Sequence, residues 1–328
     1  NISENNIGII LKDKVNKRYV LAFLNSYYGQ IQIQCSANPQ VQSKLNVNDV
    51  EGLKIPLPPR EIQDEIANIM DEAYKERRGK LAKAKKLLDS IEPYLLDQLG
   101  IELPKLEEER GIFVAKLDQV KSGRFDAHYH HPLYTKLKGA IENSKFKKYI
   151  TRLGNIVNFS SDLVDPLTTP NKVYKYLEIE HIDNELGEVE DYQEIQGKSA
   201  PSRARMALHS GDLLISSLQG SSKSIAIVPE DLDGAIGSTG FIVIRQNDMV
   251  NNTFIWALFR TSIYQKLIFR EATGAIMAAL LHAQSTVMRS TPSSFSIQNR
   301  IAEEIKHRRK GAKQRLRQLT ENPRDQGL

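Results

Sequence analysis

Residues 55–67, IPLPPREIQDEIA, mark the start of the element that organises this chain. Pro56, Pro58 and Pro59 end whatever precedes them, because proline fixes φ and donates no backbone hydrogen bond. From Glu61 to about Leu99 the apolar residues recur at three- and four-residue spacing, and most of the others are Lys, Arg, Glu and Asp. This pattern predicts a long amphipathic helix that needs a partner helix to cover its apolar face.

A second copy of this region lies 235 positions further along the chain (297 − 62 = 235). A constant offset over about 60 residues is hard to obtain by chance, so we interpret the chain as the end of one unit followed by a complete second unit. The motifs that match are Ile62-Gln63 with Ile297-Gln298, Ile66-Ala67 with Ile301-Ala302, Tyr19 and Ala22 with Phe254 and Ala257, and Ser3, Ile7 and Ile9 of an expected opening strand with Ser238, Ile242 and Ile244.

The second unit mixes strand and helix patterns, which predicts an α+β fold with a mainly antiparallel or mixed sheet. Short apolar runs bounded by turn residues indicate strands at Val173–Ile179, Asp212–Ser216, Ile225–Val228 and Gly240–Ile244. Helical patterns cover Tyr134–Tyr149 and Phe254–Phe269. We therefore expect two α/β globules separated by long antiparallel helices in a coiled-coil-like spacer, with boundaries at 1–59, 60–103, 104–295 and 296–328.

The apolar stripe of the first long helix is its expected contact surface. It is predicted to meet the second long helix or a helix of another protein, and its members are Ile66, Met70, Ala84, Leu88, Ile91 and Leu95. Two like helices lying side by side would hold two globules at a fixed distance. Such a spacer would measure the gap between two half-sites on a ligand.

Composition places the chain among ordinary globular proteins, with 40% hydrophobic and 26% charged residues. No apolar run approaches the roughly 18–20 residues that span a bilayer, and no leader precedes the fold, so a cytoplasmic location is expected. The single cysteine, Cys35, fits a reducing compartment. A formal charge of +5 permits polyanion binding without demanding it.

Taken together in their order along the chain, six segments resemble the specificity subunit of type I restriction-modification systems. They are residues 55–67, GRFDAHY at 123–129, YLEIEHID at 176–183, APSRAR at 200–205, GDLLI at 211–215 and GSTGF at 237–241. The resemblance covers nearly the whole chain. It implies two target recognition domains that alternate with two conserved helices, each domain reading one half of a split sequence in double-stranded DNA.

The resemblance also implies partner subunits, and it implies that this chain catalyses no reaction itself. The helices would dock methyltransferase (M) subunits, and a restriction/translocase (R) subunit would complete the complex. No catalytic residue or cofactor is expected here, because S-adenosylmethionine, ATP and Mg²⁺ would sit on partner subunits. The first domain is expected to lack its N-terminal half, since Asn1 aligns with the Ile236 region, and the second helix is expected to stop after about Leu319.

Two polar loops of the second unit, at 198–205 and 219–223, supply the candidate DNA contacts. Lysine and arginine bind phosphates, and arginine can also read guanine with two hydrogen bonds. The candidates are Lys198, Arg203, Arg205, Gln219, Ser221, Ser222 and Lys223. Arg203 and Arg205 have an alternative interpretation, in which each braces the fold by pairing with an acidic residue.

The sequence gives only weak indications of a metal site. His128, His130 and His131 lie near Asp126, but no further ligand follows at metal-site spacing, so no metal is expected. Two alternative functions stay open. The chain could be the C-terminal specificity region of a fused methyltransferase-endonuclease, or a helical scaffold whose globules bind protein rather than DNA.

Overall fold

The structure, a computed structural model, describes residues 7–36, 45–104, 112–114, 126–218, 221, 223–271, 286–288 and 292–320. The chain divides into two compact units. Unit 1 comprises Asn1–Lys86 and Gly311–Leu328, and unit 2 comprises Leu87–Lys310. The predicted α+β fold class is confirmed. Within the described part of the chain, none of the helices combines the length and the apolar character needed to cross a bilayer.

The helices of unit 1 are short except for the first long one. They are α1 (Lys17–Leu24), α2 (Tyr27–Ser36), α3 (Val47–Glu51) and α4 (Arg60–Asp89), whose last residues belong to unit 2. Pro58 and Pro59 stand directly before α4, as the sequence predicts. Residues 7–12 are not a strand, so the expected opening strand is wrong in its described part, which excludes Ser3.

The first long helix is divided rather than continuous. It ends at Asp89, and α5 (Ile91–Leu99) begins after Ser90. Pro93 explains the break, because proline has no N–H to donate to the carbonyl of residue 89 in an unbroken helix. Ser90 Oγ donates instead to the Leu87 carbonyl at 2.6 Å. Gly100 closes α5 at φ +62, a left-handed conformation that glycine adopts without strain.

Unit 2 contains the remaining helices, of which α11 continues into unit 1. They are α7 (Pro132–Glu142), α8 (Asn252–Arg260), α9 (Ser262–Glu271) and α11 (Pro292–Thr320). The helix expected over Tyr134–Tyr149 is therefore shorter, and that over Phe254–Phe269 is two helices. Thr261 separates those two, where its hydroxyl donates to the Leu258 carbonyl at 2.6 Å.

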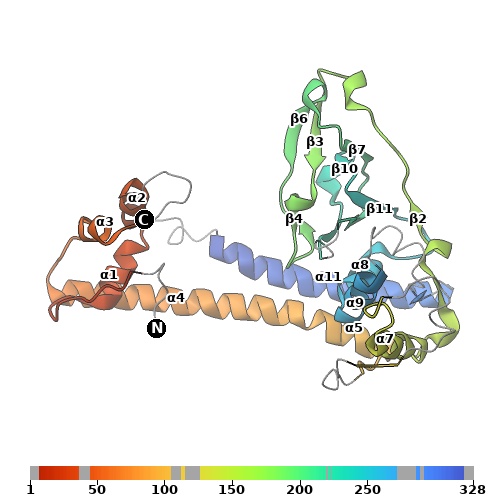
Figure 1. The fold of residues 1–328 in the computed structure, drawn as a ribbon, viewed down its shortest axis with the longest axis horizontal. Helices are drawn as coiled ribbons and strands as arrows, with labels where there is room; N and C mark the ends of the chain where they lie inside the picture. Colours follow the sequence, from red (N-terminus) through yellow and green to blue (C-terminus); the bar gives the residue numbers. More distant parts are fainter. Residues whose placement is uncertain are drawn as a thin grey trace. The chain divides into compact units, whose positions relative to one another are not determined.

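Eight strands of unit 2 form two four-stranded sheets, ordered β6-β3-β10-β7 and β2-β11-β8-β9, and the other described strands pair as β1-β12 and β4-β5 (Figure 1). Only the β10–β3 pair is parallel within these sheets, so the first is mixed. The bounds are β1 (Ile150–Arg152), β2 (Asn158–Phe159), β3 (Val173–Leu177), β4 (Ile182–Asp183), β5 (Glu188–Val189), β6 (Gln193–Gln196), β7 (Ala204–Ala207), β8 (Leu213–Ser216), β9 (Ile225–Ile227), β10 (Ile236–Ser238), β11 (Phe241–Arg245) and β12 (Thr286–Met288).

The β2-β11-β8-β9 sheet is buried on both faces. Successive side chains of a strand point to opposite faces. Leu213 and Ile215 of β8 join the core formed with α5, α7, α8, α9 and α11, whereas Leu214 joins a second core with residues of the other sheet. This explains the uninterrupted apolar runs of β8 and β11.

Candidate nucleic-acid interface

The turn between β10 and β11 joins the two sheets, and it brings Arg203 of a predicted contact loop and Ser217 just after β8 to one edge. Thr239 N–H donates to the carbonyl of Arg203 at 2.8 Å. Gly240 carbonyl accepts from both the N–H (2.8 Å) and the hydroxyl (2.7 Å) of Ser217. Arg203 of the first predicted contact loop and Ser217, which lies just before the second, therefore converge on Thr239 and Gly240. We call Arg203, Ser217, Ser221, Lys223, Thr239 and Gly240 the recognition edge.

The two arginines of the 200–205 segment have different environments. Arg205 is 33% exposed and pairs with Asp165 at 2.8 Å, which fits the bracing interpretation. Arg203 is 65% exposed, and its pairing with Glu178 is loose, at 3.8 Å. A long, exposed ion pair contributes little. Arg203 is thus the arginine that is available to a ligand.

Glu178 is fixed beside Arg203 by a buried tyrosine. Tyr176 Oη donates to Glu178 Oε1 at 2.7 Å. Burial, together with this bond to a carboxylate, raises the pKa of Tyr176 to about 12. The tyrosine therefore keeps its proton at neutral pH and holds the carboxylate in place near the guanidinium.

Lys223 is exposed, and its backbone is fixed from the helical side of unit 2. Arg260 of α8 donates from Nη1 to the Lys223 carbonyl at 2.8 Å. Its Nη2 donates to the carbonyls of Asn184 (2.9 Å) and Glu185 (2.7 Å), in the turn between β4 and β5. One guanidinium therefore ties the β8–β9 connection to the β4–β5 turn.

A stack of Trp256, Arg260 and Arg309 supports that tie, and we call it the arginine–tryptophan cluster. The guanidinium carbons lie 5.2 Å (Arg260) and 4.0 Å (Arg309) from the Trp256 ring centroid. Trp256 Nε1 donates to the carbonyls of Gly187 (3.1 Å) and Ile225 (3.0 Å). Gly187 has φ +64, and a Cβ there would lie 2.7 Å from Arg260 Nη1, so the turn needs glycine.

The two arginines of the cluster share a desolvated site. Burial and the neighbouring Arg309 charge lower the pKa of Arg260 to about 10. Burial likewise lowers the pKa of Arg309, and the ion pair with Glu188 at 3.2 Å opposes that shift. Arg260 still carries its proton at neutral pH, so its three carbonyl contacts persist.

The other predicted DNA contacts are dispersed or lie outside the described residues. Lys198 is exposed on a short 3-10 turn, where its N–H donates to the Pro170 carbonyl at 3.0 Å. No contact is found between it and the recognition edge among the described residues. Ser221 accepts from Ser224 N–H at 2.9 Å. Gln219 and Ser222 lie outside the described residues.

The predicted partner stripe on the long helix separates into two parts. Ile91 and Leu95 are buried in the core that α5 forms with α8 and α11, and Leu88 packs against that core. They therefore share a core with the second long helix, which is the first of the two expected alternatives, and they are not available to another protein. Ala84 is buried as well, whereas Ile66 and Met70 keep partial exposure.

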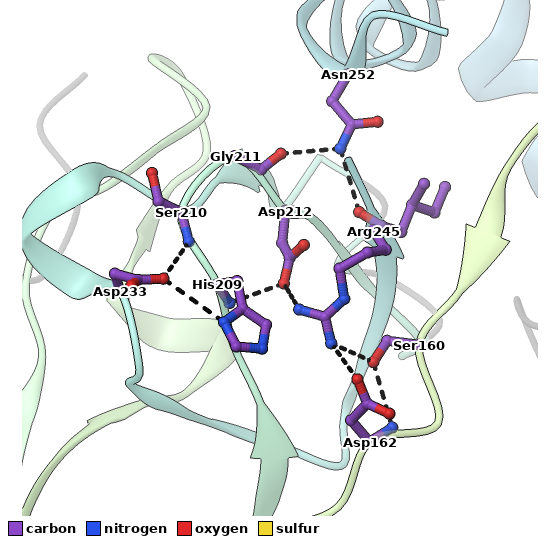
Figure 2. A network of polar contacts seen from close by, with 10 residues as sticks. Ser160, Asp162, His209, Ser210, Gly211, Asp212, Asp233, Arg245 and Asn252 are labelled. Atoms are coloured by element: carbon purple, nitrogen blue, oxygen red, sulfur yellow. Dashed lines mark hydrogen bonds and ion pairs between the residues drawn. The ribbon is translucent and has the colours of Figure 1, made fainter. Parts of the chain in front are cut away.

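A polar network occupies the opposite ends of β8 and β11 from the recognition edge (Figure 2). Arg245 donates to Asp212 Oδ2 at 2.6 Å and to Ser160 Oγ and Asp162 Oδ2 at 2.7 Å each. Asn252 Nδ2 donates to the Gly211 and Ile244 carbonyls, at 2.8 and 3.2 Å. The network thereby attaches both strands to the start of α8, which gives it a structural role.

The sequence repeat is matched by a repeated set of hydrogen bonds. In unit 1, Asn16 caps α1 and its N–H donates to Gln63 Oε1 of α4 at 2.9 Å. In unit 2, Asn251 caps α8 and its N–H donates to Gln298 Oε1 of α11 at 3.1 Å. Each asparagine also donates from Nδ2 to the residue after the glutamine, namely Asp64 and Asn299.

These anchors were missed in the sequence, although the information was present. Asn16 and Asn251 are identical residues at the 235-position offset, as are Gln63 and Gln298. The apolar contacts repeat as well, because Tyr19, Val20 and Ala67 are buried at positions equivalent to buried Phe254, Ile255 and Ala302. A helix pair is therefore attached to the start of each long helix by the same contacts.

The histidines near Asp126 have protein partners. His128 Nε2 and Tyr134 Oη lie 2.8 Å apart, and His131 Nδ1 accepts from Leu133 N–H at 3.2 Å. Arg270 donates from Nε to the Tyr129 carbonyl at 2.8 Å. Among the described residues, no group of three or more His, Cys, Asp or Glu side chains could hold a metal ion.

Comparison with known protein families gives a match over one part of the chain. The family model of the type I restriction modification DNA specificity domain matches residues 1–86. The matched segment ends within α4 and contains the first anchor, so the predicted resemblance is confirmed over the first copy of the repeat. No curated protein sequence matches the chain.

Solved structures similar to the chain include specificity subunits. The HsdS subunit from Thermoanaerobacter tengcongensis is 28% identical over 48% of this chain and 41% of its own, with a TM-score of 0.42. A chain from a study of complex assembly and conformational transition of the type I R-M system is 32% identical over 44% and 35%, with a TM-score of 0.35. The type-I S subunit from M. genitalium is 15% identical over 94% and 69%, with a TM-score of 0.45. The chain spans less than half the length of the first two.

Proposed function

We propose that this chain is a non-catalytic, cytoplasmic DNA specificity subunit of a type I restriction-modification complex. Its role is to bind double-stranded DNA and direct methyltransferase and restriction/translocase subunits to a bipartite target. The chemistry belongs to those partners, which carry S-adenosylmethionine, ATP and Mg²⁺. This chain supplies only binding and position.

One observation carries the proposal beyond the segment that matches the family. The anchor of the specificity-domain segment, Asn16 on Gln63, recurs as Asn251 on Gln298. The region after the match is therefore a second copy of the same attachment, and here the copy is joined to the two-sheet domain. Duplicated attachments of this kind fit a protein that reads two half-sites.

The recognition edge supplies the DNA contacts in this proposal. Arg203 and Lys223 offer exposed cations to phosphates. The arginine–tryptophan cluster holds the Lys223 backbone against α8. A fixed backbone keeps the lysine in register with a phosphate, so that little ordering is needed on binding.

Replacing Lys223 with alanine tests the proposal. We expect weaker binding to every duplex and a salt slope, log K against log salt, that is smaller by about 0.9, because one phosphate contact is lost. Fluorescence anisotropy of the purified chain with labelled duplexes, at about 50 to 200 mM KCl, measures both. Lys148→Ala is the matched control, since Lys148 is exposed on a 3-10 turn outside the recognition edge.

Three results would change the conclusion. A wild-type salt slope near zero would remove phosphate contacts and favour a protein-binding scaffold. Equal loss in the Lys148→Ala control would mean that binding follows net charge alone. Altered target choice at unchanged affinity would make Lys223 a base-reading residue. Methylome sequencing of cells with and without the gene would identify the target, because the modified motif should disappear on deletion.

A further inference from the structure

Residues 75–86 of α4, KERRGKLAKAKK, carry the densest run of one charge sign in the described part of this helix. The run has seven basic residues and a single acidic one, Glu76. By contrast, the preceding residues 60–74 contain five acidic residues and one basic residue, Arg60. The charge of α4 therefore changes sign along its length.

Five of these cations share one side of the helix. At about 100° per residue, they fall within an arc of about 160°. We call them the basic face of α4: Lys75, Arg78, Lys83, Lys85 and Lys86. All five are exposed, while Ala84, on the opposite side, is buried. The basic face is thus the solvent side of an amphipathic helix.

No ion pair is found between the basic face and an acidic side chain within the described residues. The one ion pair found in this run joins Lys80 to Glu76 at 2.8 Å, and Lys80 is not a member of the face. Nearer the start of the helix, the charges are paired, as in Arg60 with Asp64 at 2.9 Å. Five like charges without an ion pair repel one another, which costs helix stability unless a ligand neutralises them.

We propose that the basic face of α4 binds the phosphate backbone of double-stranded DNA. This inference rests on the proposed function and adds a second, sequence-independent contact surface to the recognition edge. The face extends over about 17 Å at 1.5 Å per residue. Duplex DNA presents a negative charge every 1.7 Å or so along its axis, so several phosphates lie within that reach.

The composition of the face favours DNA over a protein partner. Protein interfaces are depleted in lysine and centre on apolar or aromatic residues. The basic face has four lysines, one arginine and no apolar member. Lysine is a flexible point charge that suits phosphates without demanding one geometry. A surface of this kind fits the non-specific stretch between two half-sites, where affinity is needed and sequence reading is not.

The second long helix repeats part of this charge pattern at the 235-position offset. Lys310 and Lys313 stand at the positions equivalent to Lys75 and Arg78 of the basic face. The other three members, Lys83, Lys85 and Lys86, correspond to Gln318, Thr320 and Glu321. The intervening sequence has diverged, since Gly79 corresponds to Gln314 and Arg77 to Ala312.

The test compares two triple variants with the same change in charge. The α4 variant combines Lys75→Gln, Lys83→Gln and Lys86→Gln. The control variant combines Lys12→Gln, Lys14→Gln and Lys17→Gln. All six lysines are exposed, and the control set lies before and at the start of α1. Glutamine has nearly the helix propensity of lysine, so α4 should persist, as far-UV circular dichroism would verify.

Binding of the full chain to a labelled mixed-sequence duplex is measured between about 50 and 200 mM KCl. We expect the α4 variant to lose up to about 2.7 from the salt slope, at about 0.9 for each lost phosphate contact, and the control to lose less. Equal slopes for the α4 variant and wild type would overturn the proposal. So would loss of assembly with the methyltransferase at an unchanged slope, because the face would then bind protein. If the wild-type chain bound no DNA, the proposed function itself would fall.

Discussion

In both copies of the repeat a helix pair is attached to its long helix in the same way. The two copies differ in how far equivalent side chains are buried by the rest of the protein. Leu21 of α1 is 58% exposed, whereas its equivalent in α8, Trp256, is 2% exposed. Ile9 is 50% exposed, and its equivalent Ile244 is fully buried in β11. The polar anchor is present in both copies, so it does not depend on the sheets that bury the second copy.

The comparison separates two contributions to the fold. Asparagine caps and glutamine contacts define how a helix pair meets a long helix, and they are local and directional. Apolar burial determines how firmly the pair is held, and it is supplied by residues distant in sequence. In unit 1 the buried apolar cluster is Tyr19, Val20 and Ala67, far smaller than the core around α8.

The largest expected difference is at the equivalent positions Leu21 and Trp256. Trp256→Ala should destabilise unit 2 by about 3–5 kcal/mol, because it leaves a cavity and removes the stacking partner of two arginines. Leu21→Ala should change stability by less than about 0.5 kcal/mol, since that side chain is mostly exposed. Urea denaturation followed by circular dichroism measures both. Similar losses from the two substitutions would refute the distinction between the copies.

A smaller effect is expected in the middle of the long helices. Gly79 of α4 corresponds to Gln314 of α11, and a Cβ at Gly79 would meet no atom within 4 Å. Gly79→Ala should therefore stabilise α4 by about 0.5–1 kcal/mol, because the unfolded chain loses freedom and nothing clashes. Thermal unfolding would show this as a higher Tm. A lower Tm would mean that α4 needs a bend at this position.

The smallest effect concerns the acid in the first anchor. Hydrogen bonds from Asn16 and Arg60 lower the pKa of Asp64 below its usual 3.8, whereas the equivalent Asn299 does not titrate. Because the folded-state pKa is depressed, the stabilisation is present above 3.8 and is lost as the pH falls through the folded value. Acid should therefore loosen α1 before α8.

Asp64→Asn should abolish this difference, because both anchors would then be neutral. Hydrogen exchange of α1 amides, corrected for the intrinsic effect of pH, provides the measurement. Residue 64 is half-buried at the helix surface, so the change should be local. If the variant kept the same acid-induced rise in exchange, another group in unit 1 would be responsible.

Local patterns in the sequence predicted much of the fold. The four strands expected in the second unit are present as β3, β8, β9 and β11, and both long helices occur where their spacing predicts them. These elements have strong periodicity and clear breaks. The break at Ser90 was missed because Pro93 acts on the carbonyl of residue 89, which spacing of apolar residues does not reveal.

Pairing between distant residues accounts for what was not predicted. Residues 7–9 have the pattern of β11, but a strand needs neighbours, and β11 obtains them from β2 and β8 far back in the chain. Arg203 and Arg205 look alike in sequence, and only the positions of Glu178 and Asp165 separate their roles. The convergence on Thr239 and Gly240 likewise depends on the junction between two sheets.

Trp256 is the only tryptophan of the chain, and its ring contacts the guanidinium groups of both Arg260 and Arg309. Its intrinsic fluorescence therefore comes from unit 2 alone, with no label required. The wavelength of Trp256 emission should shift only when unit 2 unfolds, whereas far-UV circular dichroism reports the unfolding of every helix. Comparing the two spectroscopic transitions would show directly whether the duplicated halves melt together or one after the other.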